Sequence, residues 1–263
     1  MAIPAVDFPL NSFKRALVAG KPQIGLWSSL CNPIATEILG GSGFDWLLID
    51  GEHAPNDPVM VLSQLQALHG STTSPVVRMA WNDAVILKRH LDIGVQSFLI
   101  PFVQNAEEAT RAVAATRFPQ FGGGVRGFAA ATRANRYGRV PNYHRRAHEE
   151  LCVLVQVETR QALDNIEAIA AVEGIDGIFI GPADLSSDMG QLGNLSHPEV
   201  LAAISDAIRR IIAAGKPAGI LTGVEAEAKR WLAEGATFVA VGSDVGVLAR
   251  QTEALAARFK SSS

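Results

Sequence analysis

The sequence contains only two cysteines, Cys31 and Cys152, and they lie far apart along the chain. Disulfide frameworks and metal sites use several cysteines at short, regular spacings. We therefore interpret both residues as packed thiols, not as a bridge or a metal site.

Long apolar runs are also absent. A membrane-spanning helix needs roughly 18 consecutive apolar residues, and no stretch of this sequence approaches that length. A signal peptide places its positive charges before its apolar residues, whereas Lys14 and Arg15 follow the apolar residues of the N-terminus. We expect a cytoplasmic protein that does not bind membranes.

Strong positive charge is missing as well. The net charge is −3 at pH 7, whereas nucleic-acid-binding domains are usually strongly basic, so we expect no nucleic-acid partner. Hydrophobic residues make up 48% and charged residues 19% of the chain. This composition excludes disorder and is typical of a sheet buried on both faces.

Apolar runs of strand length alternate with longer segments of helical spacing, which predicts parallel strands joined by crossover helices. The predicted strands are 23–27, 46–50, 76–79, 97–103, 151–157, 177–180, 218–221 and 238–241. The predicted helices are 33–39, 58–68, 84–91, 106–116, 162–171, 198–214, 225–233 and 246–259. Eight such units without a dinucleotide fingerprint favour an α/β fold with one (β/α)8 TIM barrel over residues 1–263 and no nucleotide cofactor, although periodicity alone does not separate a closed barrel from an open sheet.

Residues 118–150 form an irregular, arginine-rich insertion before the fifth predicted strand. No acidic residue occurs from Thr110 to His148, while arginines accumulate there. A loop this long in a compact domain is usually functional or contacts a partner. We slightly favour a solvated basic surface or a subunit interface over a substrate-binding loop. The glycines at 122–127 could bind an anion through backbone N–H groups, but this signal is weak.

In a TIM barrel the reactive residues lie at the C-terminal ends of the strands. The second predicted strand ends in Asp50, Glu52 and His53, and the third ends in Arg78. His53 carries an imidazole, the side chain that most often serves as a general base, and could act as one here. Arg78 could bind a carboxylate or an enolate in bidentate fashion; the alternative, which does not exclude the first, is a structural ion pair with Asp50 or Glu52.

Two further acids, Glu158 and Asp184, follow the neighbouring fifth and sixth predicted strands. Two close carboxylates repel each other unless a proton or a cation intervenes. Such a pair suits a hard divalent cation, Mg²⁺ or Mn²⁺, that keeps positions open for water or substrate. The alternative, with about equal weight for these residues alone, is that one acid caps a helix and the other pairs with Arg160.

Lysine is absent from the strand ends. Schiff-base aldolases need a lysine that projects from a strand into the barrel, but all six lysines fall on predicted helices or on the entry side of strands. This pattern predicts no Schiff-base lysine and favours enolate chemistry assisted by a metal.

Five segments together resemble the class II, metal-dependent pyruvate aldolases of the 4-hydroxy-2-oxoheptanedioate aldolase type. The segments are Gly25-Leu-Trp27, Asp45-Trp-Leu-Leu-Ile-Asp-Gly-Glu-His53-Ala-Pro, Pro75-Val-Val-Arg78, Val155-Gln-Val-Glu158-Thr and Phe179-Ile-Gly-Pro-Ala-Asp184-Leu-Ser. They occur in order and with compatible spacing, and the similarity runs from about Phe13 to Phe259.

The resemblance implies an aldolase that acts on a 2-oxo acid and an aldehyde in the catabolism of aromatic compounds. It implies that Glu158 and Asp184 hold the metal, which could be Mg²⁺, Mn²⁺ or Co²⁺, that Arg78 stabilises the pyruvate enolate and that His53 is the base. Gln156 and the backbone at Ala183 would contact the keto acid.

The resemblance also implies a homohexamer, built as a dimer of trimers, in which the C-terminal helix is exchanged between subunits. It places Asp92 beside the catalytic histidine. Asp92 falls at the far end of its own predicted barrel, so a neighbouring subunit would have to supply it, and Asp50 is the local alternative. The glycine–arginine loop at 124–127 is present, but the residues around it differ from the heptanedioate enzyme.

We expect a 2-oxo acid, pyruvate or hydroxypyruvate, to lose its C3 proton to His53, directly or through a water. Strand-end position suggests that Trp27 and Leu221 line the aldehyde side. One alternative is an acyl-CoA carbon–carbon lyase of the citramalyl or malyl type, for which the arginine-rich loop would bind a nucleotide. The other is a non-catalytic barrel scaffold.

Overall fold

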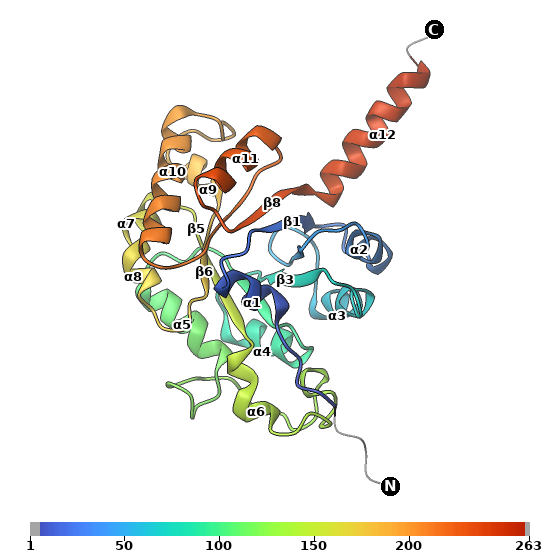
Figure 1. The fold of residues 1–263 in the computed structure, drawn as a ribbon, viewed down its shortest axis with the longest axis vertical. Coiled ribbons are helices and arrows are strands. Elements are labelled where there is room, and N and C mark those ends of the chain that lie inside the picture. Colours follow the sequence, from blue (N-terminus) through green and yellow to red (C-terminus); the bar gives the residue numbers. More distant parts are fainter. Residues whose placement is uncertain (1–5, 261–263) are drawn as a thin grey trace.

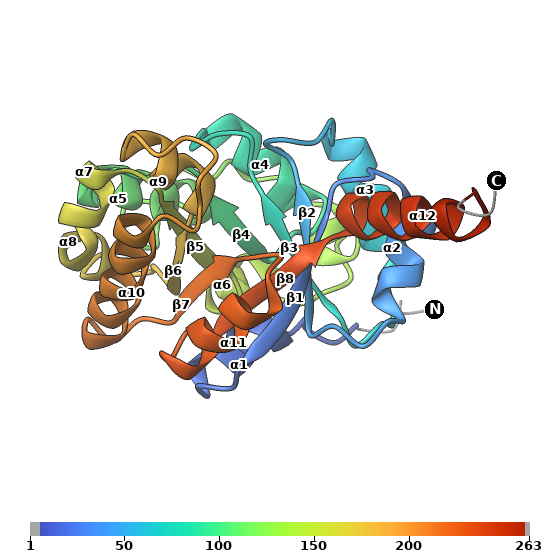
Figure 2. The ribbon, with the colours of Figure 1, turned by 90° about the horizontal axis from the view of Figure 1, so that it is seen from above.

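The computed structural model describes residues 6–260. Its centre is a closed barrel of eight parallel strands in chain order, which confirms the predicted TIM barrel (Figures 1 and 2). The strands are β1 (Gln23–Ser28), β2 (Trp46–Asp50), β3 (Ser74–Arg78), β4 (Ser97–Ile100), β5 (Cys152–Val157), β6 (Gly177–Ile180), β7 (Ala218–Leu221) and β8 (Phe238–Ser243).

Helices surround the strands, and one of them leaves the barrel. They are α1 (Ser12–Val18), α2 (Pro33–Gly40), α3 (Pro58–Ala67), α4 (Ala84–Asp92), α5 (Ala106–Thr116), α6 (Tyr143–Arg146), α7 (Arg160–Asp164), α8 (Ile166–Ala170), α9 (Pro182–Asp188), α10 (Pro198–Ala213), α11 (Glu225–Ala233) and α12 (Asp244–Lys260), with 3-10 turns η1 (Arg133–Asn135) and η2 (Ala147–Glu149). None of the helices between residues 6 and 260 combines the length and apolarity required to cross a bilayer.

Aromatic side chains fill the interior of the barrel. Phe13 of α1, Trp46 and Phe238 are fully buried there and contact one another at ring-centroid distances of 5.7–6.1 Å. Gly25 makes room for this cluster, because a Cβ at that position would lie 2.2 Å from the Trp46 ring. A second, larger apolar layer separates the strands from the outer helices, so the barrel is a packed core and not a pore.

Several elements depart from the predicted ones. β4 ends at Ile100 and not at residue 103, because Phe102 adopts a left-handed backbone conformation with φ +54°. The predicted helix 162–171 is two helices, broken at Asn165. The helices α1 and α9 were not predicted.

The helix α12 begins at Asp244, two residues earlier than predicted, and projects away from the barrel (Figures 1 and 2). Asp244 is the only buried residue of α12, and its carboxylate accepts hydrogen bonds from the backbone N–H groups of Ser29 (2.9 Å) and Leu30 (3.1 Å) beyond β1. Apolar side chains of α12 remain exposed, including Val247, Leu248, Leu255 and Phe259. The helix therefore leaves an apolar surface that no other part of residues 6–260 covers.

The arginine-rich segment lies at the N-terminal end of the barrel. It contains no strand between α5 and β5, and the Arg133 guanidinium donates to the carbonyl of Ile93, just beyond α4 (2.7 Å). Arg126 is buried, and its guanidinium stacks over Phe118 at 4.5 Å. In its own chain this segment is far from the C-terminal strand ends.

Candidate active site

Acidic and cationic side chains gather at the C-terminal ends of β2, β3, β5 and β6. Because these strands are parallel and neighbouring in the closed barrel, their ends meet at one face. Asp50 and Arg78 end β2 and β3, and Glu158 directly follows β5. Asp184 lies in the first turn of α9, which begins two residues after β6.

The Arg78 guanidinium is held by two carboxylates. Its Nε and Nη2 donate to the two oxygens of Asp50 at 2.9 and 2.7 Å, and its Nη1 lies 2.9 Å from Glu52 Oε2 in an ion pair. Burial raises the pKa of Asp50, but the Arg78 contacts and the backbone N–H groups of Glu52 and His53 outweigh it and lower that pKa. The structural ion pair considered for Arg78 is therefore present, and it fixes the guanidinium in one orientation.

His53 is exposed on this face. Its backbone N–H donates to Asp50 Oδ1 at 3.3 Å, while its ring forms no hydrogen bond with any of residues 6–260. Asp50 thus orders the turn at His53 and does not orient the imidazole. Asp92 ends α4 at the opposite end of the barrel, where its charged neighbours are Arg126 and Lys88, so it does not reach His53 of its own chain.

Glu158 is almost fully buried, with 2% exposure. Its Oε1 accepts the backbone N–H of Phe102 at 2.8 Å, and its Oε2 accepts a short hydrogen bond from Gln156 Nε2. Burial, with a smaller contribution from the negative charges of Asp184 and Glu52, raises the pKa of Glu158 to about 7 against the lowering effect of these two hydrogen bonds. The alternative partner Arg160 instead contacts Asp188 and the Met189 carbonyl.

These residues fit a divalent cation. Burial raises the pKa of Glu52 although Arg78 lowers it, and the negative charges of Asp50 and Asp184 raise it as well. The carboxylates of this face therefore lie close enough to repel one another. Gln156 Oε1 is a buried acceptor without a partner among the described residues. No set of three His, Cys, Asp or Glu side chains within residues 6–260 could hold a metal, so Glu158 and Asp184 would bind a cation whose remaining ligands are water or substrate oxygens.

Two residues assigned to the aldehyde side occupy different environments. Leu221 lines a cavity of about 460 Å³ together with Ala183, between α9, α10 and α11. Trp27 is instead buried in the barrel interior, where its ring packs on Phe179 at 5.5 Å and lies under the Arg78 guanidinium at 5.2 Å. Leu221 can thus line a substrate cavity, whereas Trp27 supports Arg78.

Three contributions to the site were not expected from the sequence. Glu52 was considered only as an ion-pair partner of Arg78, which it is, but its charge also acts on Glu158. The Phe102 backbone N–H, which donates to Glu158, could not be identified from the sequence, because every residue except proline carries this donor. Gly181 had a usable signal, since it precedes Pro182 and Asp184 directly after a predicted strand.

The Gly181→Ala variant should perturb the site without a backbone penalty. The φ of Gly181 is −93°, which alanine adopts readily, but an added Cβ would lie 2.3 Å from Glu158 Oε2 and 2.8 Å from Gln156 Nε2. We expect the Glu158 carboxylate to be displaced and affinity for a divalent cation to fall at least about tenfold, as for other ligand-positioning changes. Isothermal titration with Mn²⁺ measures this, with Gly41→Ala as the control, because its nearest atom is 3.6 Å away. Equal affinities would contradict the prediction.

The raised pKa of Glu158 predicts a pH dependence of the metal-free protein. The folded chain keeps a proton on Glu158 up to about pH 7, whereas the unfolded chain loses it near its ordinary value of about 4.3. The free energy of unfolding should therefore decrease as pH rises from about 4.5 to 7, by up to about 3 kcal/mol from this group. Urea unfolding of EDTA-treated protein at pH 5 and pH 8 measures the change. Glu158→Gln should remove this contribution. The prediction would be refuted if the free energy of unfolding of the variant changed with pH as much as that of the wild type.

Comparison with known proteins shows which family this chain is similar to. The model of the HpcH/HpaI aldolase/citrate lyase family matches residues 23–251. The chain is 60% identical over 250 residues to a 4-hydroxy-2-oxo-heptane-1,7-dioate aldolase of Salmonella heidelberg, covering 95% of this chain and 94% of the relative. It is 58% identical over 254 residues to a pyruvate aldolase of Rhizobium etli, covering 97% and 99%.

A solved structure agrees with the sequence relatives. A HpcH/HpaI aldolase/citrate lyase family protein from Burkholderia cenocepacia superposes with a TM-score of 0.92 at 37% identity, covering 95% of this chain and 99% of that one. The chain belongs to the HpcH/HpaI aldolase/citrate lyase family. This confirms the resemblance found in the sequence, and with it the prediction of an aldolase, an enzyme that cleaves carbon–carbon bonds.

Proposed function

We propose that this chain catalyses the reversible aldol addition of a 2-oxo acid, pyruvate or hydroxypyruvate, to an aldehyde. The observation that carries the proposal is that the charges of Asp184 and Glu52 act on the buried Glu158 carboxyl, beside the Arg78 guanidinium that Asp50 and Glu52 hold in place. The names of the relatives at 58–60% identity support the same chemistry.

Glu158 and Asp184 would hold the divalent cation, with Mg²⁺ and Mn²⁺ as the first candidates and Co²⁺ as a third. When bound, such a cation supplies a Lewis acid that stabilises the negative charge of an enolate. The positions of the lysines support this assignment over a Schiff base: Lys14 and Lys216 donate to the carbonyls of Leu151 and Ile175, which precede β5 and β6 at the other end of the barrel.

Residues of the chain stabilise the enolate, transfer the proton and bind the two substrates. Arg78 stabilises the enolate, and its two carboxylate partners hold it in place before substrate arrives, which avoids reorganisation during the reaction. His53 removes the C3 proton and returns it in the reverse direction. Gln156 and the backbone of Ala183 contact the keto acid, and Leu221 contacts the aldehyde.

The test is exchange of the C3 protons of pyruvate and hydroxypyruvate into D2O, followed by NMR. We expect exchange with Mg²⁺ or Mn²⁺, loss of exchange with EDTA and recovery after the metal is restored. Exchange that persists in EDTA would refute the metal-assisted mechanism. No exchange with either acid would refute the proposed substrate class.

The exposed helix α12 supports an assembly in which neighbouring subunits exchange this helix. Such an exchange would cover the apolar side chains of α12, and we propose a homohexamer built as a dimer of trimers. We further propose that Asp92 of one subunit orients His53 of its neighbour, because the two residues lie at opposite ends of one barrel. Analytical ultracentrifugation measures the assembly.

The acyl-CoA alternative gains no support from the arginine-rich segment. Arg126 and Arg133 pack at the N-terminal end of the barrel, away from the acids that would perform the chemistry. The scaffold alternative is excluded by membership in a family of aldolases.

A further inference from the structure

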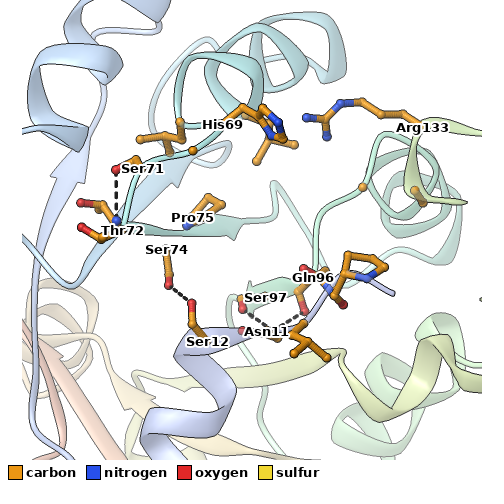
Figure 3. Close-up of a pocket in the computed structure, with 18 of the residues that line it drawn as sticks. Asn11, Ser12, His69, Ser71, Thr72, Ser74, Pro75, Gln96, Ser97 and Arg133 are labelled. Carbon is orange, nitrogen blue, oxygen red and sulfur yellow. Dashed lines mark hydrogen bonds between the residues drawn. The ribbon is translucent and has the colours of Figure 1, made fainter. Parts of the chain in front are cut away.

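A polar cavity of about 270 Å³ lies at the N-terminal end of the barrel (Figure 3). It is bounded by the start of α1, the loops that precede β3 and β4, and the arginine-rich segment. Ser74 and Ser97, the first residues of β3 and β4, both line it. The cavity is therefore at the opposite end from Glu158 and Arg78, and the aldolase function does not account for it.

Two arginines line this cavity, and none of the described residues that line it carries a carboxylate. The arginines are Arg133 and Arg136, and His69 lies beside them. An adjoining cavity shares the same three residues and also lacks an acid. In Figure 3 the Arg133 guanidinium extends toward the His69 ring. Two arginines thus line one space in which no residue of 6–260 supplies a negative charge.

Neither arginine is neutralised by the rest of the described chain. Within residues 6–260, no carboxylate forms an ion pair with Arg133 or Arg136. Burial lowers the pKa of Arg133, and the charge of Arg136 lowers it further. Half-buried like charges repel each other in a medium less polar than water. A bound anion would relieve both the repulsion and the loss of hydration.

The cavity also offers hydroxyl donors and one arginine in a fixed position. Thr72 lines it, and Ser12 and Ser74 form one hydrogen bond with each other at 2.9 Å, which leaves one hydroxyl hydrogen of that pair available. The Arg133 Nη1 is held by the Ile93 carbonyl at 2.7 Å, which leaves its other N–H groups available. Arginine and hydroxyl groups together are the usual ligands of phosphate and carboxylate oxygens.

We propose that this cavity binds a small oxyanion, a phosphate group or a carboxylate, with Arg133 and Arg136 as its charge partners and the hydroxyls of Thr72 and of the Ser12–Ser74 pair as further donors. The site uses two arginines of the 118–150 segment, and it would give the enzyme an anion-binding position separate from its catalytic face.

Isothermal titration of the full chain with inorganic phosphate, and separately with malonate, tests this site. Chloride replaces the anion at equal ionic strength in the reference titration. We expect saturable binding of at least one of the two, and the tighter one identifies the class of ligand. Arg136→Gln should weaken it at least tenfold, because one of two charge partners is lost. This variant should fold, since the Arg136 side chain forms no hydrogen bond with the other described residues.

Arg139→Gln is the matched control, because Arg139 lies on the same segment, is exposed and lines neither cavity. Its affinity should equal that of the wild type. Arg133→Gln should weaken binding as Arg136→Gln does, and both variants should keep pyruvate proton exchange. No saturable binding, or equal affinity in both arginine variants and the wild type, would overturn the proposal. A smaller sedimenting species in Arg136→Gln would also overturn it, since the arginine would then serve a subunit contact.

Discussion

The Glu158→Gln variant should lose divalent-metal binding and at least about 10³-fold of the rate of pyruvate C3 proton exchange, the scale associated with removing a major electrostatic contribution. The amide keeps the size of the side chain but removes the charge that a hard cation requires. In metal-free protein the same change removes repulsion among Glu158, Asp184 and Glu52, so the fold should be retained. Titration with Mn²⁺, proton exchange and urea unfolding measure the three effects.

Glu107→Gln is the matched control for this variant. Glu107 is highly exposed and pairs with Arg111 on the surface of α5, so both metal affinity and exchange should equal those of the wild type. Unchanged metal affinity in Glu158→Gln would show that the cation is held elsewhere. Lost metal affinity with normal exchange would separate the metal from the reaction.

The Arg78→Met variant should lose both stability and activity. Arg78 is 7% exposed and is the cationic partner of Asp50 and Glu52, so its removal leaves buried carboxylates unpaired. Breaking a buried ion pair in this way costs about 3–5 kcal/mol. Loss of an enolate-stabilising group should also lower the exchange rate about 10²–10³-fold. Urea unfolding and proton exchange measure the two losses.

Arg78→Lys separates the structural role from the catalytic one. Lysine keeps the positive charge but cannot reproduce the two parallel hydrogen bonds to Asp50, so it should recover part of the stability and little of the exchange rate. Arg209→Met on the exposed surface of α10 is the control and should change neither property. Full exchange activity in Arg78→Lys would show that only charge is needed at this position.

Much of the barrel could be predicted because its strands are short, apolar and sharply bounded. β2, β6 and β7 have the predicted bounds, since buried parallel strands read as continuous apolar runs. The end of β4 could not be predicted in the same way. A left-handed conformation at Phe102 is imposed by tertiary contacts and has no signal in a residue that rarely adopts it.

The candidate site was predictable to the extent that topology determines it. Glu158 and Asp184 were expected to be neighbours because the strands before them are adjacent and parallel in a closed barrel. The backbone N–H of Phe102 on Glu158 could not be predicted, because every residue except proline carries that donor. Arg126 was read as part of a solvated or interface surface, but it is buried over Phe118, since the arginine plane packs on aromatic rings as well as pairing with acids.

The projecting helix α12 has a consequence for the order of events in folding. Helices in proteins gain most of their stability from tertiary packing, and of the 17 residues of α12 only Asp244 is buried. The barrel can close within one chain in a first-order reaction. In the proposed hexamer, docking of α12 on a neighbouring subunit would be a second-order step. Its apparent rate constant would decrease in proportion as the protein is diluted, whereas the rate constant of barrel closure would not depend on concentration.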